Sequence, residues 1–149
     1  MHRGLSVTLV ALLAVTAVAC GSSNPAAPSN PGGSNSVTSL RITDTREGTG
    51  TEATNGRTLT VNYTGWLYDQ NAAGNRGVQF DTSTGRGPLV FRLGTGGVIS
   101  GWDQGLVGMR VGGLRTLVIP ASLAYGSSGN SSIPPNAALV FDVELLSVQ

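Results

Sequence analysis

The sequence predicts an α+β, mainly β fold in which a single antiparallel β-sheet curls around one short α-helix. Apolar residues recur with a helical period in one stretch, residues 98–109, at Ile99, Trp102, Leu106 and Met109. Elsewhere apolar residues alternate with polar ones, as in strands that bury one face. Because every strand then has one apolar face and one helix is available to cover it, the sheet has to wrap around that helix.

Residues 1–19 are predicted to be a secretory signal peptide. Arg3 precedes an almost uninterrupted apolar run, which ends in the small residues Ala17, Val18 and Ala19. The run is short for a membrane-spanning helix, and the polar tract that follows it has no lysine or arginine next to the run. We therefore expect the protein to be exported to the cell envelope.

Cys20, the only cysteine, follows this run in the context AVACG, which resembles the lipobox of bacterial lipoproteins. Ordinary cleavage at the same bond is the alternative, and it leaves a free thiol. Since an unpaired thiol is a liability in an oxidising compartment, lipidation of Cys20 is the favoured prediction. It would anchor the protein to a membrane as a periplasm-facing or surface lipoprotein. The rest of segment 20–36 contains only Gly, Ser, Asn, Pro and Ala, which predicts a disordered linker.

Residues 37–149 have the length of one domain with one core. Without the signal peptide, the chain has eight arginines, eight carboxylates, no lysine and no histidine. This neutral balance argues against a nucleic-acid partner. The composition also excludes histidine bases, Schiff-base lysines and the usual His or Cys metal sites, so we expect neither a metal nor a cofactor. An enzyme built on this domain has to work without acid–base or covalent chemistry.

The strands are predicted from alternation and the loops from clusters of Gly, Pro, Asn and Ser. Leu40 and Ile42 are expected to share the buried face of the first strand. In the last strand, Asp142 and Glu144 are expected on the face opposite the apolar residues. The region 69–77 reads as a loop within a long connection, 66–79. The expected strands are residues 40–43, 58–64, 89–93, 114–119 and 138–148.

The helix should begin at Ser100, because Ser100 and Asp103 have the spacing of a capping box. Gly101 and Gly105 each disfavour a helix by up to about 1 kcal/mol relative to alanine, so packing must stabilise this segment. With Ser100 as the cap, the backbone N–H of Ile99 has no partner within the helix and lies beside the Trp102 indole.

Several separated motifs together resemble the FKBP-type peptidyl-prolyl cis-trans isomerases. The resemblance covers essentially all of residues 37–149, and it implies the same sheet wrapped around a short helix. Its specificity comes from the agreement of many motifs in order and approximate spacing. These motifs are residues 61–65 (VNYTG), 80–81 (FD), 98–102 (VISGW), 124–126 (AYG), 133–135 (IPP) and 139–145 (LVFDVEL).

The resemblance implies a hydrophobic pocket for proline and binding of proline-containing polypeptide segments and of macrolides of the rapamycin class. A monomer is expected. The Ile99 N–H and the Tyr125 hydroxyl are expected to hold substrate carbonyls, and Asp81 is expected to stabilise the pocket wall or the twisted carbonyl. The remaining substrate-binding residues are Tyr63, Phe80, Leu89, Val98, Trp102, Ile133 and Phe141.

Each residue taken singly has a plainer interpretation: Asp81 as a turn residue, Tyr125 as a packing residue and Trp102 as core. The function predicted from the whole set is rotation of Xaa-Pro bonds in exported proteins by desolvation and hydrogen bonding. The alternative is a non-catalytic proline-binding chaperone module of the cell envelope, which would use the same pocket without turnover.

Overall fold

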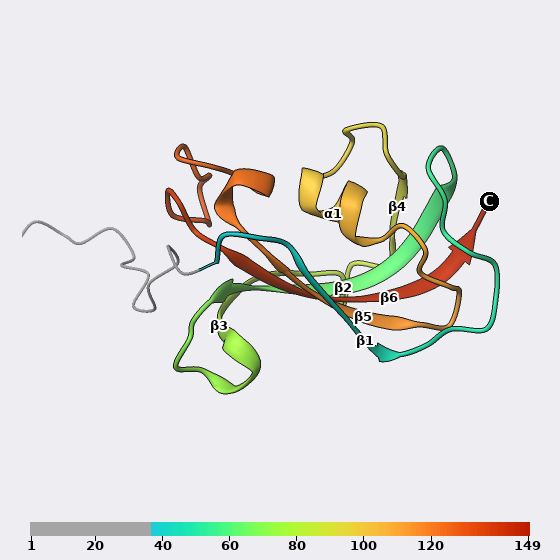
Figure 1. The fold of residues 1–149 in the computed structure, drawn as a ribbon, viewed down its shortest axis with the longest axis horizontal. Helices are drawn as coiled ribbons and strands as arrows, with labels where there is room; N and C mark the ends of the chain where they lie inside the picture. The colour runs from blue at the N-terminus through green and yellow to red at the C-terminus, as the bar shows by residue number, and fades with distance from the viewer. Residues whose placement is uncertain (1–36) are drawn as a thin grey trace, which may run out of the picture.

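The computed structural model of the protein describes residues 37–149, so the predicted signal peptide, Cys20 and the predicted linker lie outside the described residues. The described chain forms a sheet with one short α-helix and two 3₁₀ turns (Figure 1). No helix in this part is long and apolar enough to cross a membrane. In chain order the elements are β1 (Arg41–Arg46), β2 (Thr58–Tyr68), η2 (Ala73–Asn75), β3 (Arg76–Thr82), β4 (Leu89–Arg92), α1 (Ser100–Gly105), β5 (Leu114–Ile119), η3 (Ala121–Leu123) and β6 (Leu139–Val148).

Strand β2 organises the sheet, whose order is β1-β5-β6-β2-β3 with β4 paired to β2. Every pair is antiparallel, as predicted. One edge of β2 pairs with β6 over most of its length. The other edge pairs first with β4, from Thr58 to Val61, and then with β3, from Thr64 to Tyr68. The loop 83–88 thus interrupts this edge beside Tyr63, where the functional site lies.

The core lies between the sheet and α1, which sits on one side of the curved sheet in Figure 1. The helix packs unusually close to β5. An added Cβ at Gly101 would lie 2.4 Å from Ile119 Cγ2, and one at Gly105 would lie 2.8 Å from Leu117 Cδ2. The two glycines therefore disfavour the helix locally but allow it to approach the sheet, and this packing is what holds it. Fully buried side chains of this core include Leu59, Val61, Leu93, Leu117, Ile119, Leu139, Val143 and Leu145.

The predicted capping box of α1 is wrong. The N-cap residue is Ile99, and no side-chain cap hydrogen bond forms, because Ser100 is already the first helical residue. The Asp103 carboxylate instead accepts hydrogen bonds from the backbone amides of Gly94 and Gly96. The helix also ends at Gly105, before the apolar pattern does, although Leu106 and Met109 are buried as predicted.

The predicted burial of Ile42 is wrong as well. Strand β1 pairs only with β5, and all six of its residues are exposed. Ile42 lies opposite the buried Leu117 but is itself 46 % exposed. Alternation indicated which face of the strand is apolar, but at the sheet edge, where β1 lies, residues 37–149 leave Ile42 exposed.

Half of the long connection predicted between residues 66 and 79 is strand. Strand β2 continues to Tyr68 and β3 starts at Arg76, so a short turn containing η2 joins them. The guanidinium of Arg76 forms a bidentate ion pair with Asp142 and stacks over Trp66, 5.3 Å from the ring centroid. This cluster fastens the extension to the outer face of the sheet, where the sequence predicted Asp142.

Candidate functional site

A cavity of about 190 Å³ opens between α1, β3 and β6. A larger cavity of about 480 Å³ beside Asn62 and Glu144 is lined mainly by polar residues and glycines, with a single aromatic ring, that of Tyr63. The smaller one is the candidate site, since apolar walls with a few polar groups are typical of small-ligand sites. Nine of the ten residues predicted from the resemblance line it, and Gly97 is an addition. Its lining residues are Tyr63, Phe80, Asp81, Leu89, Gly97, Val98, Ile99, Trp102, Tyr125 and Phe141.

Trp102 forms the floor of this cavity. It is 3 % exposed, and its ring centroid lies 5.2 Å from that of Tyr63 and 5.3 Å from that of Phe141, in both cases edge to face. Phe80 meets Phe141 edge to face at 5.5 Å. Such aromatic pairs contribute about 0.5–1.5 kcal/mol beyond area burial and fix the ring orientations. The walls are therefore apolar and rigid, and Trp102 belongs to both the core and the pocket.

Gly65 makes room for two of these rings. A Cβ added there would lie 2.6 Å from Phe141 Cε1 and 2.8 Å from Phe80 Cζ. The pairing of β2 with β3 also shifts register between Gly65 and Trp66. A missing side chain in the sheet thus creates the space in which Phe80 and Phe141 meet.

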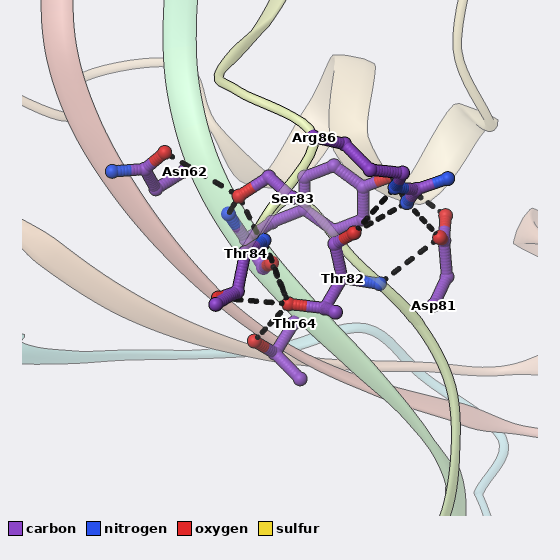
Figure 2. A network of polar contacts seen from close by, with 8 residues as sticks. Asn62, Thr64, Asp81, Thr82, Ser83, Thr84 and Arg86 are labelled. Atoms are coloured by element: carbon purple, nitrogen blue, oxygen red, sulfur yellow. Dashed lines mark hydrogen bonds and ion pairs between the residues drawn. The ribbon is translucent and has the colours of Figure 1, made fainter.

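Asp81 belongs to the polar side of the site, at one end of the network of contacts in Figure 2. Its carboxylate accepts hydrogen bonds from the Tyr63 hydroxyl at 2.6 Å and from the Thr82 backbone amide at 2.9 Å, and it forms an ion pair with Arg86. Burial opposes ionisation of Asp81, but these hydrogen bonds and the guanidinium charge outweigh it, so the pKa of the carboxyl lies below its ordinary value. Burial of the Tyr63 hydroxyl, together with its hydrogen bond to the Asp81 carboxylate and the charge of that group, raises the pKa of Tyr63 to about 12.

Ser83 has a role that the sequence analysis missed. Its hydroxyl accepts a hydrogen bond from the Tyr63 backbone amide at 3.0 Å, and its own amide donates to the Tyr63 carbonyl. These bonds replace the strand pairing that is absent where β3 has ended and β4 has not begun. Figure 2 shows Ser83 beside the hydroxyl cluster of Thr64, Thr82 and Thr84. A serine in a polar loop gives no sequence signal for this role.

Two of the residues that line the cavity, Ile99 and Tyr125, carry hydrogen-bond donors. Ile99 lies at the start of α1, and its backbone N–H makes no hydrogen bond within residues 37–149, as predicted. Tyr125 is 39 % exposed at the rim, and its pKa is raised by burial and by the charge of Asp81. The Tyr125 hydroxyl therefore stays protonated and able to donate at neutral pH.

Ile133 does not line the cavity. It is 2 % exposed and packs within the main core. The backbone of Asn130 and Ile133 closes a short turn, reinforced by a hydrogen bond from the Ile133 amide to the Asn130 side chain at 2.9 Å. The Ile133 side chain therefore belongs to the core and not to the cavity lining. Asp81 lies near the end of β3. Its carboxylate contacts Tyr63 and Arg86 as well as its neighbour in the chain, so it does more than cap a turn.

No group of three or more His, Cys, Asp or Glu side chains suited to a metal ion occurs within residues 37–149. The polar groups at the cavity are hydrogen-bond donors and a paired carboxylate. The arrangement can hold an apolar ring against Trp102 and donate hydrogen bonds to carbonyl oxygens beside it.

Comparison with known proteins agrees with this geometry. Residues 49–146 match the family model of the FKBP-type peptidyl-prolyl cis-trans isomerase. An FK506-binding protein of Neisseria meningitidis serogroup A / serotype 4A is 49 % identical over 112 residues, which are 74 % of this chain and 96 % of the relative.

Two solved structures show the same fold. AtFKBP13 is 38 % identical with a TM-score of 0.64, over 74 % of this chain and 93 % of that one. FkpA from Escherichia coli is 46 % identical with a TM-score of 0.65, over 75 % of this chain and 49 % of that one. Family match, identity and fold agree, and so the chain belongs to the FKBP-type peptidyl-prolyl cis-trans isomerases.

Proposed function

We propose that the isomerase acts on Xaa-Pro segments of exported proteins and that the aromatic cavity binds the proline ring over Trp102. The observation that carries this assignment is that α1 supplies two groups to one cavity. One is the buried indole of Trp102, and the other, at the start of the helix, is the Ile99 N–H, which has no hydrogen-bond partner within residues 37–149. Tyr63, Phe80 and Phe141 supply the walls, and Leu89 and Val98 form the rim.

Desolvation lowers the barrier in this proposal. The Xaa-Pro bond rotates across a barrier of about 18–20 kcal/mol, because resonance makes the amide planar and that resonance is lost on twisting. Twisting also reduces the charge separation of the amide. An apolar wall therefore favours the twisted state relative to the planar one, whereas water favours the planar dipole. Differential binding of the twisted state is what accelerates rotation.

Oriented donors add to this effect. The Ile99 amide holds one carbonyl of the bound peptide and the Tyr125 hydroxyl a second. Each tenfold increase in rate requires about 1.4 kcal/mol of differential stabilisation, so desolvation with one or two hydrogen bonds is sufficient in scale. Tyr63 and Arg86 hold the Asp81 carboxylate in place. Its negative charge then stabilises neighbouring groups of the pocket wall or interacts with the twisted carbonyl. No proton is transferred.

The test is an NMR exchange measurement on a short peptide with leucine before proline. We expect faster cis–trans exchange with the protein, and loss of that acceleration on adding rapamycin. Rapamycin should also quench tryptophan fluorescence through Trp102, while Trp66, on the outer face, is unaffected. Binding of the peptide without faster exchange would contradict catalysis and identify a proline-binding module.

Asp81→Asn is expected to lower kcat/KM by about 10- to 100-fold. The substitution keeps the shape of the side chain and removes its charge, which weakens hydrogen bonds to a charged group worth about 1.5–3 kcal/mol. The peptide exchange assay measures this, with circular dichroism as the folding control. Complete inactivity of a folded variant would mean that the carboxylate performs indispensable chemistry. Unchanged activity would leave Asp81 as a turn residue only.

The isomerisation rate is expected to be constant between about pH 5 and pH 9. Asp81, whose pKa is lowered, stays ionised over this range, and Tyr63, with a pKa of about 12, stays protonated. The contribution of Asp81 to stability is present above pH 3.8 and is lost as the pH falls through its lowered folded-state pKa. The contribution of Tyr63 to stability is present below pH 10 and is lost as the pH rises towards its folded-state pKa of about 12. A bell-shaped profile around neutrality would contradict catalysis without proton transfer.

We also propose that the protein is an exported lipoprotein anchored through Cys20. Supporting this are the apolar segment, the small residues before Cys20 and the absence of any other cysteine. Stable membrane residence requires more than one acyl chain, at about 0.8 kcal/mol per buried CH₂. Cys20→Ala should move the protein from the membrane fraction to the soluble envelope fraction. A wild-type protein that is already soluble, with the mass of a free thiol, would contradict lipidation.

A further inference from the structure

The loop between β4 and α1 forms a wall of the cavity, and Val98 and Ile99 of this wall pack against the main core. The preceding residues 94–97 are exposed, and of these Gly97 alone belongs to the cavity lining. Both Gly94 and Gly96 have positive φ, 78° and 75°, so the loop depends on glycines and gains no side-chain contacts from them. The position of this exposed glycine turn has to be fixed by another group.

Asp103 supplies the fixed point. One carboxylate oxygen accepts the Gly94 amide at 2.8 Å, and the other accepts the Gly96 amide at 2.9 Å. The loop's other side-chain hydrogen bond runs from the Thr95 hydroxyl to the Arg92 carbonyl and stays within the loop region. Hydrogen bonds from amides to a carboxylate are roughly twice as strong as those between neutral groups. Asp103 therefore ties both ends of the glycine turn to α1.

The residue before Asp103 on the helix is Trp102, the floor of the cavity. The same turn of α1 thus carries the floor, Trp102, and the clamp, the Asp103 carboxylate, and Ile99 is the N-cap residue of this helix. We propose that Asp103 is a positioning residue of the isomerase: it sets the wall 97–99 and the Ile99 amide at a fixed distance from the indole. This rests on the proposed function of the cavity, and it assigns no contact between Asp103 and substrate.

The test compares Asp103→Ala and Asp103→Asn with the wild-type protein. Asp103→Ala removes both bonds, and Asp103→Asn keeps one acceptor oxygen. We expect kcat/KM on the leucine–proline peptide, and affinity for rapamycin, to fall about 10-fold in Asp103→Ala and by a smaller factor in Asp103→Asn. Amide hydrogen exchange of Gly94 and Gly96 should accelerate in the same order.

Asp69→Ala is the matched control, because Asp69 also accepts a backbone amide in a turn, that of Asn71 at 2.9 Å, and lies outside the cavity lining. It should leave activity and rapamycin affinity within about twofold of wild type. Unchanged activity and affinity in Asp103→Ala, despite faster exchange at Gly94 and Gly96, would overturn the proposal. So would losses that follow only the unfolded fraction, measured by urea unfolding.

An inactive wild-type protein would contradict the proposed function separately. In that case the rapamycin affinities of the Asp103 variants decide whether the clamp positions the cavity. An unchanged affinity overturns the inference, and a graded loss from Asp103→Asn to Asp103→Ala supports it.

Discussion

Trp102→Ala is expected to lower both stability and activity more than any other single change in the cavity. Truncation of a buried tryptophan to alanine lowers the free energy of unfolding by about 3–5 kcal/mol. Trp102 packs against Tyr63, Phe141 and Phe91, the last with ring centroids 5.6 Å apart, so its loss also opens the pocket to water. Since every 1.4 kcal/mol of lost transition-state stabilisation lowers the rate about tenfold, we expect kcat/KM to fall at least about 100-fold.

Urea unfolding followed by far-UV circular dichroism measures the stability loss, and the peptide exchange assay is run on the folded fraction. Trp102→Phe keeps an aromatic floor and should lose less of both quantities. Trp66→Ala is the control for loss of an indole, because Trp66 lies on the outer face under Arg76 and leaves the pocket intact. A folded Trp102→Ala variant with wild-type activity would show that the floor takes no part in catalysis.

Arg115→Ala is expected to destabilise the fold by about 3 kcal/mol, although Arg115 does not line the cavity. Its side chain is 9 % exposed, and it donates two hydrogen bonds to Asp44, at 2.6 and 2.9 Å. It also donates to the carbonyls of Gly105 and Val107 at the end of α1. Removing one partner of a buried pair costs about 3–5 kcal/mol, and we take the lower end because Asp44 is partly exposed.

Urea unfolding at neutral pH measures this loss, and Arg46→Ala is the matched control. Arg46 pairs with Glu144 on the surface, where both side chains are at least 36 % exposed, and such pairs contribute about 0–1 kcal/mol. The hydrogen bonds from Arg115 hold the pKa of Asp44 below its ordinary value, so stability from this pair is present above pH 3.8 and is lost on acidification. Equal destabilisation by the two variants would contradict the buried role of Arg115.

Several parts of the fold were predictable because they depend on local order along the chain. Alternation identified β5 in full and the buried face of β6, on which Leu139 and Val143 lie. Helical spacing identified the segment containing Trp102 and the burial of Leu106. A periodic pattern states which side of an element is apolar, and the largest apolar faces have to be buried. Ile42 shows the limit, because burial also requires a neighbour to cover the face.

The cavity residues were predictable mainly from the resemblance, since they come from separate motifs that only the family pattern connects. Residues such as Phe80, Tyr125 and Phe141 have no periodicity in common. Ser83 escaped prediction because its partner, the Tyr63 amide, is free only where β3 has ended and β4 has not begun. Ile133 lies outside the cavity lining because its direction depends on the four-residue turn 130–133, which the motif alone does not define.

The sequence by itself determined a neutral mainly β domain with one short helix, a chemistry without histidine or lysine, and the set of aromatic residues at the site. The tertiary structure decided which polar group each side chain satisfies. The capping pattern predicted that Asp103 interacts with the free amides at the start of its own helix. Its carboxylate instead accepts hydrogen bonds from the amides of Gly94 and Gly96. The physical reason is that hydrogen bonds form between groups that are close in space, and only the tertiary fold brings the amides of Gly94 and Gly96 to 2.8 and 2.9 Å from the Asp103 carboxylate.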